Sequence, residues 1–260
     1  MILFAEERHK EQIAVLWNEA FGDSCKDVLK YLEVLLKYFV VFEEEGRVYG
    51  MLALLPVRLG EKKGRYVYAV ATLKEARGRG ISTELLNFAK KFIKQASEDF
   101  LVLVPQSESL FDFYKKRGFK AFSCVGTGEA FFNEIEDVKI YISEITPEKY
   151  YSIRRKYFAN LIEWDSDMLA FVKDMYNGTF YRLKKDDIEI GSAFCFSAGD
   201  TVYVKELCTD SENIALSVAA LANRYQKMCV KYNFADFSEK PYAMIYPETI
   251  ENAYFGIAMD

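Results

Sequence analysis

One stretch of the chain, residues 66–89, joins an apolar run to an amphipathic segment through a basic turn punctuated by glycine. Residues 66–73 are β-branched or aromatic at most positions and apolar on both alternating sides, which indicates a strand buried inside a sheet. Apolar residues recur at helical spacing over 85–92, which predicts a helix beginning near Arg79. The stretch therefore predicts strand, loop and helix in succession, and with them an α/β fold.

The turn at the start of that helix, residues 77–82 (RGRGIS), has the composition of an anion site. Unpaired backbone N–H groups, the positive end of the helix dipole and the charges of Arg77 and Arg79 all favour a phosphate or pyrophosphate. Gly78 and Gly80 lack a Cβ atom, so they can adopt positive φ and let an anion approach the backbone. The turn matches neither a Walker A sequence nor the GxGxxG dinucleotide pattern, and alone it is equally compatible with an ordinary basic helix start.

A second motif follows downstream. Residues 100–104 form an apolar run that predicts a strand, and residues 113–119 (FYKKRGF) place Tyr114 on a short helix that closes at Gly118. The order of a strand ending in VAT, an RGRG turn opening a helix, a strand, a polar turn and FYKKRGF resembles the GNAT superfamily of acyl-CoA-dependent N-acyltransferases. The resemblance covers roughly residues 1–122 and only part of the second half.

This resemblance implies an acyl-CoA donor, expected to be acetyl-CoA, bound where the 66–73 strand ends. The N–H near Val70 would polarise the thioester carbonyl as charge develops on its oxygen. Main-chain groups of three strand residues would pair with the pantetheine arm: Val70, Ala71 and Thr72. Main-chain amides of six turn residues would hold the pyrophosphate: Arg77, Gly78, Arg79, Gly80, Ile81 and Ser82.

Two further positions take roles from the resemblance. Tyr114 stands where the family often places a tyrosine that donates its proton to the departing thiolate. An isolated tyrosine on an amphipathic helix is more often a core aromatic, so this role depends on the surrounding motif. Ser107 stands where many relatives have an asparagine that helps to bind the pantetheine.

The sequence does not identify the general base that an attacking amine needs. Glu33, Glu43 and Glu108 fall near the expected cleft, and each is also compatible with a solvated surface charge. A water-mediated base ranks above a carboxylate at the chain terminus, Asp260, which the family sometimes uses. Trp164 would line an acceptor pocket if exposed, although tryptophan more commonly packs in a core.

The first half has the element order of the family. Its expected elements are a strand at 2–4, helices at 7–20 and 26–37 with Ser24 as a cap, and a hairpin of 39–43 with 48–58. The second half repeats this layout. Its expected elements are a strand at 138–143, helices at 147–159 and 165–176, a hairpin of 179–183 with 189–196, a strand at 201–208 and a helix at 214–230.

The regular offset between the halves, about 135 residues, indicates a tandem duplication. The second copy of the turn, Thr209 to Asn213, carries two acids and no glycine, so it would repel a pyrophosphate. We therefore expect two GNAT-like units, each a mixed, mostly antiparallel sheet flanked by helices. Residues 1–135 would form the acetyl-CoA-binding domain, and residues 136–260 a degenerate domain contributing to the acceptor site.

Composition narrows the function further. A net charge of −5 and a pI near 5.3 argue against a nucleic-acid partner. No apolar run reaches the ~18 residues of a membrane span. Five scattered cysteines without CxxC spacing and a single histidine argue against a metal site and favour a reducing, cytoplasmic location. The oligomeric state is not predicted.

The leading functional prediction is acetyl transfer from acetyl-CoA to a primary amine of a small molecule or peptide, by direct attack in a ternary complex. The alternative is a non-catalytic acyl-CoA-binding or regulatory module. A purely structural role would require that no CoA species binds. Transfer of other acyl or aminoacyl groups also occurs on duplicated folds of this kind, and the acceptor cannot be read from the sequence.

Overall fold

The computed structural model describes residues 1–133, 139–236, 241–250 and 253–259. By their contacts the residues fall into two units, Met1–Lys120 with Met244–Thr249 and Ala121–Ala243 with Ile250–Asp260. The boundary expected at residues 135 and 136 lies outside the described residues, and the observed division falls earlier in the chain. The reason is that the strand beginning at Lys120 belongs to the sheet of the second unit, as described below.

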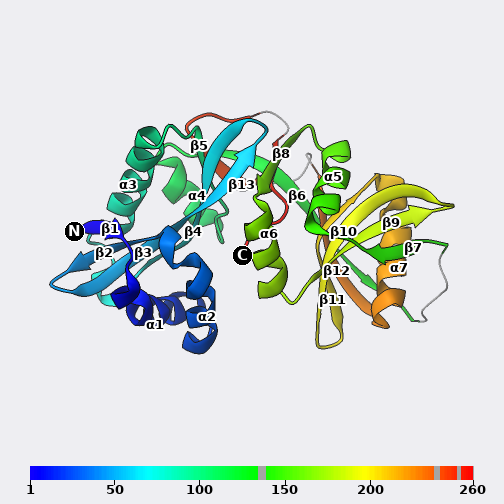
Figure 1. Ribbon diagram of the computed structural model, residues 1–260, viewed down its shortest axis with the longest axis horizontal. Coiled ribbons are helices and arrows are strands. Elements are labelled where there is room, and N and C mark those ends of the chain that lie inside the picture. Colours follow the sequence, from blue (N-terminus) through cyan, green and yellow to red (C-terminus); the bar gives the residue numbers. More distant parts are fainter. Residues whose placement is uncertain (134–138, 237–240, 251–252, 260) are drawn as a thin grey trace. The chain divides into compact units, whose positions relative to one another are not determined.

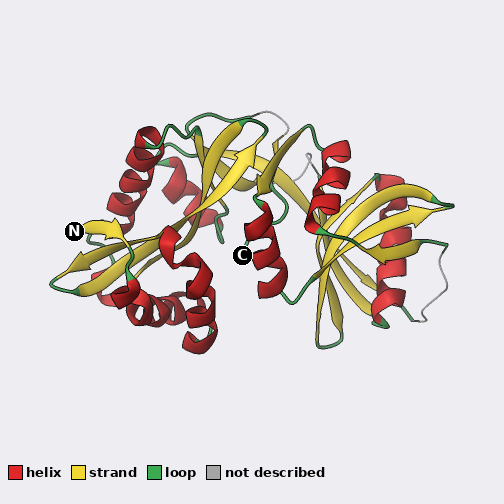
Figure 2. Cartoon of the chain, in the orientation of Figure 1, coloured by secondary structure: helices red, strands yellow, loops and turns green. Residues whose placement is uncertain are grey.

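Unit 1 is a mixed sheet with helices on both faces (Figures 1 and 2). Its strands lie in the order β1 (Ile2–Phe4), β2 (Phe39–Glu44), β3 (Arg47–Leu59), β4 (Lys62–Thr72), β5 (Phe100–Leu103) and the end of β13 (Pro241–Tyr246). Its helices are α1 (Lys10–Phe21), α2 (Cys25–Leu35), α3 (Ile81–Gln95) and α4 (Glu108–Lys115). Helices α1 and α2 lie on one face of the sheet and α3 on the other (Figure 1).

Local sequence explains these helices. Ser24 caps α2, because its side chain accepts a hydrogen bond from the Asp27 N–H at 3.2 Å. Helix α1 ends at Gly22, which adopts a left-handed φ of 90°. The apolar stripe of α3, which includes Leu85 and Ala89, is buried against the sheet.

Unit 2 repeats this arrangement. Its strands lie in the order β7 (Tyr141–Glu144), β9 (Thr179–Lys185), β10 (Ile188–Ala198), β11 (Thr201–Thr209), β12 (Cys229–Ala235) and β6 (Lys120–Phe131). Its helices are α5 (Pro147–Tyr157), α6 (Ser166–Met175) and α7 (Ile214–Tyr225). A short parallel pair, β8 (Asn160–Trp164) with β14 (Ala253–Tyr254), completes the unit. The expectation of two α/β units with mixed sheets is confirmed.

The last strand of each sheet comes from the other half of the chain. Strand β6 follows α4 of unit 1, yet it pairs antiparallel with β12 of unit 2. Residues 244–246 of β13 follow β12, yet they pair antiparallel with β5 of unit 1. The sequence predicts two consecutive units and gives no sign of this exchange.

Several predicted boundaries differ from the structure. The helix expected to reach Val230 ends at Tyr225, because Gln226 adopts a left-handed φ of 52° and Val230 belongs to β12. Strand β6 was not expected, because Gly126 and Gly128 interrupt its apolar alternation. Of the helices in the described residues, none is both long and apolar enough to cross a membrane.

Candidate functional site

Strands β4 and β5 separate at the point where the sequence places the donor site. They pair in parallel only at residues 64–66 with 100–102. Among the described residues, the remainder of β4 up to Thr72 is paired on one side only, with β3. Val70, Ala71 and Thr72 lie in this part of β4. A strand that is unpaired on one side presents main-chain groups to an added extended segment.

A distortion of β4 lies at the start of the unpaired part. The pairing of β3 with β4 shifts register between Met51 and Ala53, and Ala69 adopts a φ of 50°. This conformation costs an L-residue about 1–2 kcal/mol and is uncommon for alanine. A bulge of this kind changes the direction of the main-chain groups that follow it, and Val70 is the next residue. No feature of the sequence predicted the bulge.

The basic turn leads directly into α3. Gly78 and Gly80 both have a φ of 84°, and apart from the adjacent residues no described atom lies within 4 Å of where a Cβ atom would stand at either position. In the described part of the chain, the N–H groups of Gly78, Gly80, Ile81 and Ser82 have no acceptor. Four free amides beside open space at the positive end of a 15-residue helix form a cradle for an anion.

The two arginines of the turn have partners within the protein. Arg79 Nη2 donates to both carboxylate oxygens of Glu44, at 2.7 and 2.6 Å, and its guanidinium lies 5.3 Å from the ring centroid of Tyr49. Arg77 Nε donates to the Thr72 carbonyl at 3.3 Å. Anion binding in this conformation would therefore depend on the amides of the turn more than on these side chains.

A hydroxyl pair joins β4 to α3. Thr72 Oγ1 and Ser82 Oγ lie 2.9 Å apart, so two of the residues singled out in the sequence are in contact. Ser107 is the N-cap residue of α4 and is exposed, and its Oγ lies 3.0 Å from Ser109 Oγ.

Tyr114 is buried in unit 1, with only 6% of its surface exposed. Its ring meets Phe113 and Phe119 edge-on, with centroids 5.2 and 5.8 Å away. Burial raises the pKa of Tyr114 to about 12, although the Arg117 guanidinium acts to lower it. Its hydroxyl bonds to none of the described residues. The phenol is therefore protonated at neutral pH and is free to donate.

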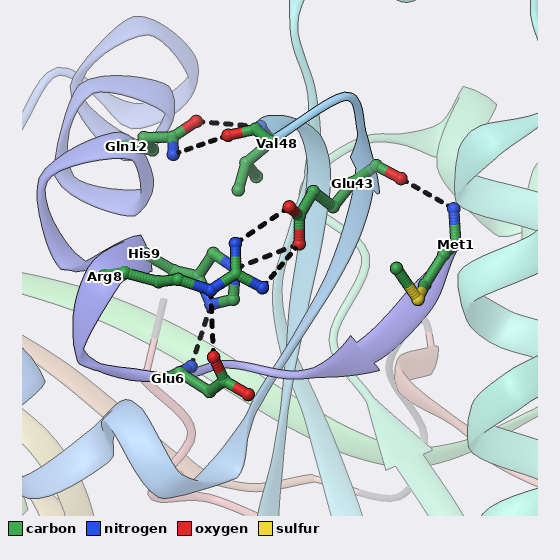
Figure 3. Close-up of polar contacts among 8 residues, drawn as sticks. Met1, Glu6, Arg8, His9, Gln12, Glu43 and Val48 are labelled. Atoms are coloured by element: carbon green, nitrogen blue, oxygen red, sulfur yellow. Dashed lines mark hydrogen bonds and ion pairs between the residues drawn. The ribbon is translucent and has the colours of Figure 1, made fainter.

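Glu43, one of the three candidate bases, is held in an ion pair (Figure 3). Arg8 Nη1 and Nη2 donate to its two oxygens at 2.8 and 2.9 Å. His9 Nδ1 accepts from the Glu6 N–H, which leaves His9 Nε2 as the protonated nitrogen, 3.2 Å from Glu43 Oε2. The bonds from Arg8 lower the pKa of Glu43 to about 2. A carboxylate held so firmly ionised is a poor proton acceptor near neutral pH, so the structure argues against Glu43 as the base.

The other candidates have ordinary surroundings. Glu33 is an exposed partner of Lys10, at 2.9 Å, and Glu108 is an exposed residue in the first turn of α4. Trp164 is buried in unit 2 and its Nε1 donates to the Ile257 carbonyl at 2.7 Å, so it lines no open pocket. The expected alternative at the terminus, Asp260, lies outside the described residues. The described residues therefore do not identify a base.

In unit 2 the corresponding strands stay together. β11 is parallel to β12 from the Thr201–Cys229 pair to the Leu207–Phe234 pair, close to the ends of both strands. The turn after β11 is a short 3₁₀ helix at Ser211–Asn213. The described residues of unit 2 therefore contain neither a one-sided strand nor a glycine turn like those of unit 1.

A buried charged cluster joins α5 to β11. Arg154 Nη2 donates to Glu206 Oε1 at 2.8 Å, and the Tyr150 hydroxyl donates to Glu206 Oε2 at 2.5 Å. Each of the three side chains is at most 1% exposed. Cys208 Sγ lies 3.3 Å from Glu206 Oε2, and burial raises the pKa of this thiol well above its ordinary value.

Comparison with known proteins agrees with this geometry. The family model described as acetyltransferase (GNAT) domain matches residues 2–122. No curated protein matches significantly in sequence.

Solved structures resemble nearly the whole chain. A GCN5-related N-acetyltransferase from Anabaena variabilis has a TM-score of 0.71 at 16% identity, covering 94% of this chain and 72% of that one. A GCN5-related N-acetyltransferase from Kribbella flavida has a TM-score of 0.69 at 12% identity, covering 94% and 70%. A tandem GNAT protein from the clavulanic acid biosynthesis pathway has a TM-score of 0.57 at 12% identity, covering 94% and 97%. At these identities the likeness establishes the fold.

The separation of β4 from β5 and the amide-lined turn both lie within the part of the chain that the GNAT domain model matches. Over nearly its whole length the chain has the fold of solved GCN5-related N-acetyltransferases, and its residues 2–122 match the acetyltransferase (GNAT) domain model.

Proposed function

We propose that the protein is an N-acetyltransferase that transfers the acetyl group of acetyl-CoA to a primary amine of a small molecule or peptide. The observation that carries the proposal is a combination that, among the described residues, occurs in unit 1: a one-sided β4 with four free amides at the start of α3. The pantetheine arm would lie along residues 70–72 of β4. The pyrophosphate would be bound by the amides of Gly78 to Ser82.

In the proposed reaction the amine nitrogen attacks the thioester carbonyl, a C–N bond forms and the C–S bond breaks. The main chain near Val70 would stabilise the negative charge on the carbonyl oxygen. Tyr114, protonated and free to donate, would give its proton to the sulfur of the departing thiolate. The proton lost by the amine would leave through water, because the described residues present no suitable carboxylate.

The proposal places the protein in a reducing compartment and leaves the identity of the amine acceptor open. The described cysteines form no disulfide, which supports a reducing compartment such as the cytoplasm. The contribution of unit 2 to the acceptor site stays a prediction.

Two measurements test the proposal. Calorimetric titration with acetyl-CoA should saturate at one molecule per chain, since unit 2 has no comparable turn. Release of CoA thiol should then be followed with a panel of primary amines. Binding followed by release on at least one amine supports the enzyme, whereas binding without release on any amine supports a regulatory module. A wild-type protein that binds no CoA species contradicts both.

A further inference from the structure

Arg117 follows α4, at the end of the basic run that begins with Lys115, and it folds back onto α3. Its Nε and Nη2 both donate to Thr83 Oγ1, at 3.0 and 2.6 Å. Its Nη1 donates to the Phe113 carbonyl at 2.7 Å. Thr83 lies in the first turn of α3, directly after the amides of Ile81 and Ser82. One guanidinium therefore ties the end of α4 to the anion-binding end of α3.

The same guanidinium also supports the ring of Tyr114. Its central carbon lies 3.4 Å from the centroid of Phe113, so the two planar groups are in contact. Phe113 in turn meets the Tyr114 ring edge-on. A continuous series of contacts thus runs from Thr83 through Arg117 and Phe113 to Tyr114.

The main chain at Arg117 is fixed as well. Lys90 Nζ, also on α3, donates to the Arg117 carbonyl and lies 4.7 Å from the ring centroid of Tyr246. The Arg117 N–H donates to the Tyr114 carbonyl at 2.9 Å. Both the backbone and the side chain of Arg117 are therefore held against α3.

We propose that Arg117, through Thr83, is a positioning residue that couples the anion-binding turn of α3 to the placement of Tyr114. This role rests on the proposed function. A lysine could not replace it, because the three bonds and the ring contact need a planar fork with several donors. The sequence did not indicate the role, because a basic run before a glycine looks like a solvated surface.

The first test compares two substitutions of Thr83. Thr83→Val keeps the shape of the side chain but removes the oxygen that Arg117 bonds, whereas Thr83→Ser keeps that oxygen. We expect Thr83→Val to lower kcat for thiol release by about tenfold or more, as misplacement of a catalytic group does. Thr83→Ser should stay close to the wild type, and the Kd for acetyl-CoA should change less than kcat in both. Equal kcat in the two variants contradicts the proposal.

The second test asks whether Arg117 acts through Tyr114. Arg117→Lys should lower kcat in the wild-type background and have no further effect in a Tyr114→Phe background. A purely structural residue would lower kcat by the same factor in both backgrounds, which would overturn the proposal. Melting temperatures of the four proteins show whether each is folded.

A third measurement does not need turnover. In the wild type and in Thr83→Ser, acetyl-CoA should slow hydrogen exchange of the amides of α4, and in Thr83→Val this protection should be lost. If acetyl-CoA still slows exchange of the α4 amides in Thr83→Val, the coupling between the α3 turn and α4 is contradicted, even if no amine acceptor has been found. If the wild type is active and the Thr83 and Arg117 variants have the same kcat as the wild type, the positioning role is wrong but the proposed function stands. A wild type that does not bind acetyl-CoA removes the proposed function and the positioning role together.

Discussion

Strands β4 in unit 1 and β11 in unit 2 occupy the same place in their sheets. Among the described residues, part of β4 is unpaired on one side, whereas β11 is paired on both sides almost to its end. Each is antiparallel to the strand before it and parallel to β5 or β12, respectively. Each has an irregular register with the preceding strand, next to Ala71 in one unit and Glu206 in the other. The bulge alone therefore does not open the sheet.

The difference follows from the length of the neighbouring strand and from the side chains. β5 has four residues, whereas β12 has seven and stays paired with β11 almost to its end. Beside the bulge, unit 1 has the small Ala71, while unit 2 has Glu206 bound to Arg154 and Tyr150. The two units share a framework, and among the described residues unit 1 has a strand edge open to an extended ligand where unit 2 has a paired one.

The largest expected effect concerns the turn of unit 1. Gly80→Val should abolish acetyl-CoA binding, because valine is strained at a φ of 84° and would fill the open space beside the amides. Calorimetry measures the affinity. Gly199→Val is a matched control, since Gly199 in unit 2 also has a positive φ, 56°, and open space around it. If Gly80→Val and Gly199→Val bind acetyl-CoA equally well, the assignment of the anion site to the turn of unit 1 is wrong.

The next effect concerns the buried cluster of unit 2. Glu206→Gln should lower the free energy of unfolding by about 3–5 kcal/mol, because it leaves Arg154 charged and buried without its partner. Urea unfolding measures the loss. The control is Glu163→Gln, which removes the partner of the exposed Arg155 and should cost about 1 kcal/mol or less. Equal losses of unfolding free energy in the two variants would mean that the buried ion pair contributes no more to stability than the exposed one.

Tyr114→Phe should have a somewhat smaller effect, confined to turnover. The ring and its packing stay while the proton donor is removed, so acetyl-CoA affinity and melting temperature should barely change. General acid catalysis is typically worth about 10²- to 10⁴-fold, and we expect the lower end because thiolate leaves readily. Thiol release at saturating acetyl-CoA across pH measures it. As a control, Tyr203→Phe on β11 should leave the rate of thiol release unchanged. If Tyr114→Phe also keeps the wild-type rate, Tyr114 is a packing residue and not the proton donor.

The smallest expected effect concerns how the stability of unit 1 depends on pH in acid. The pKa of Glu43 is depressed from its ordinary value of 4.5 to about 2, so its stabilising contribution is complete above pH 4.5 and is lost as pH falls toward 2. Glu43→Gln should therefore flatten the decline of stability over this range. Urea midpoints measured at several acidic pH values would test this. If the stability of the wild type and of Glu43→Gln declines in parallel as pH falls, the depressed pKa of Glu43 is contradicted.

Much of unit 1 could be predicted, because its sequence follows local rules. The apolar run of β4, the cap at Ser24 and the glycine turn each act over a few residues. The positive φ of Ala69 and the contact of Arg117 with Thr83 were not predictable, because each depends on residues distant in sequence. Glu43 was a reasonable candidate base in sequence, and only its neighbours Arg8 and His9 show that it is a structural carboxylate.

The exchange of β6 and β13 has a consequence for how the protein is made. The β5 edge of unit 1 cannot be covered until β13, about 140 residues further along the chain, has been synthesised. Until then a nascent chain that has completed β1 to β5 carries an unpaired strand edge, which is a site for association with other chains. A fragment that stops at Lys120 would keep that edge permanently. A cut after Lys120 therefore separates unit 1 from its last strand, whereas all the described residues of unit 2 lie after the cut.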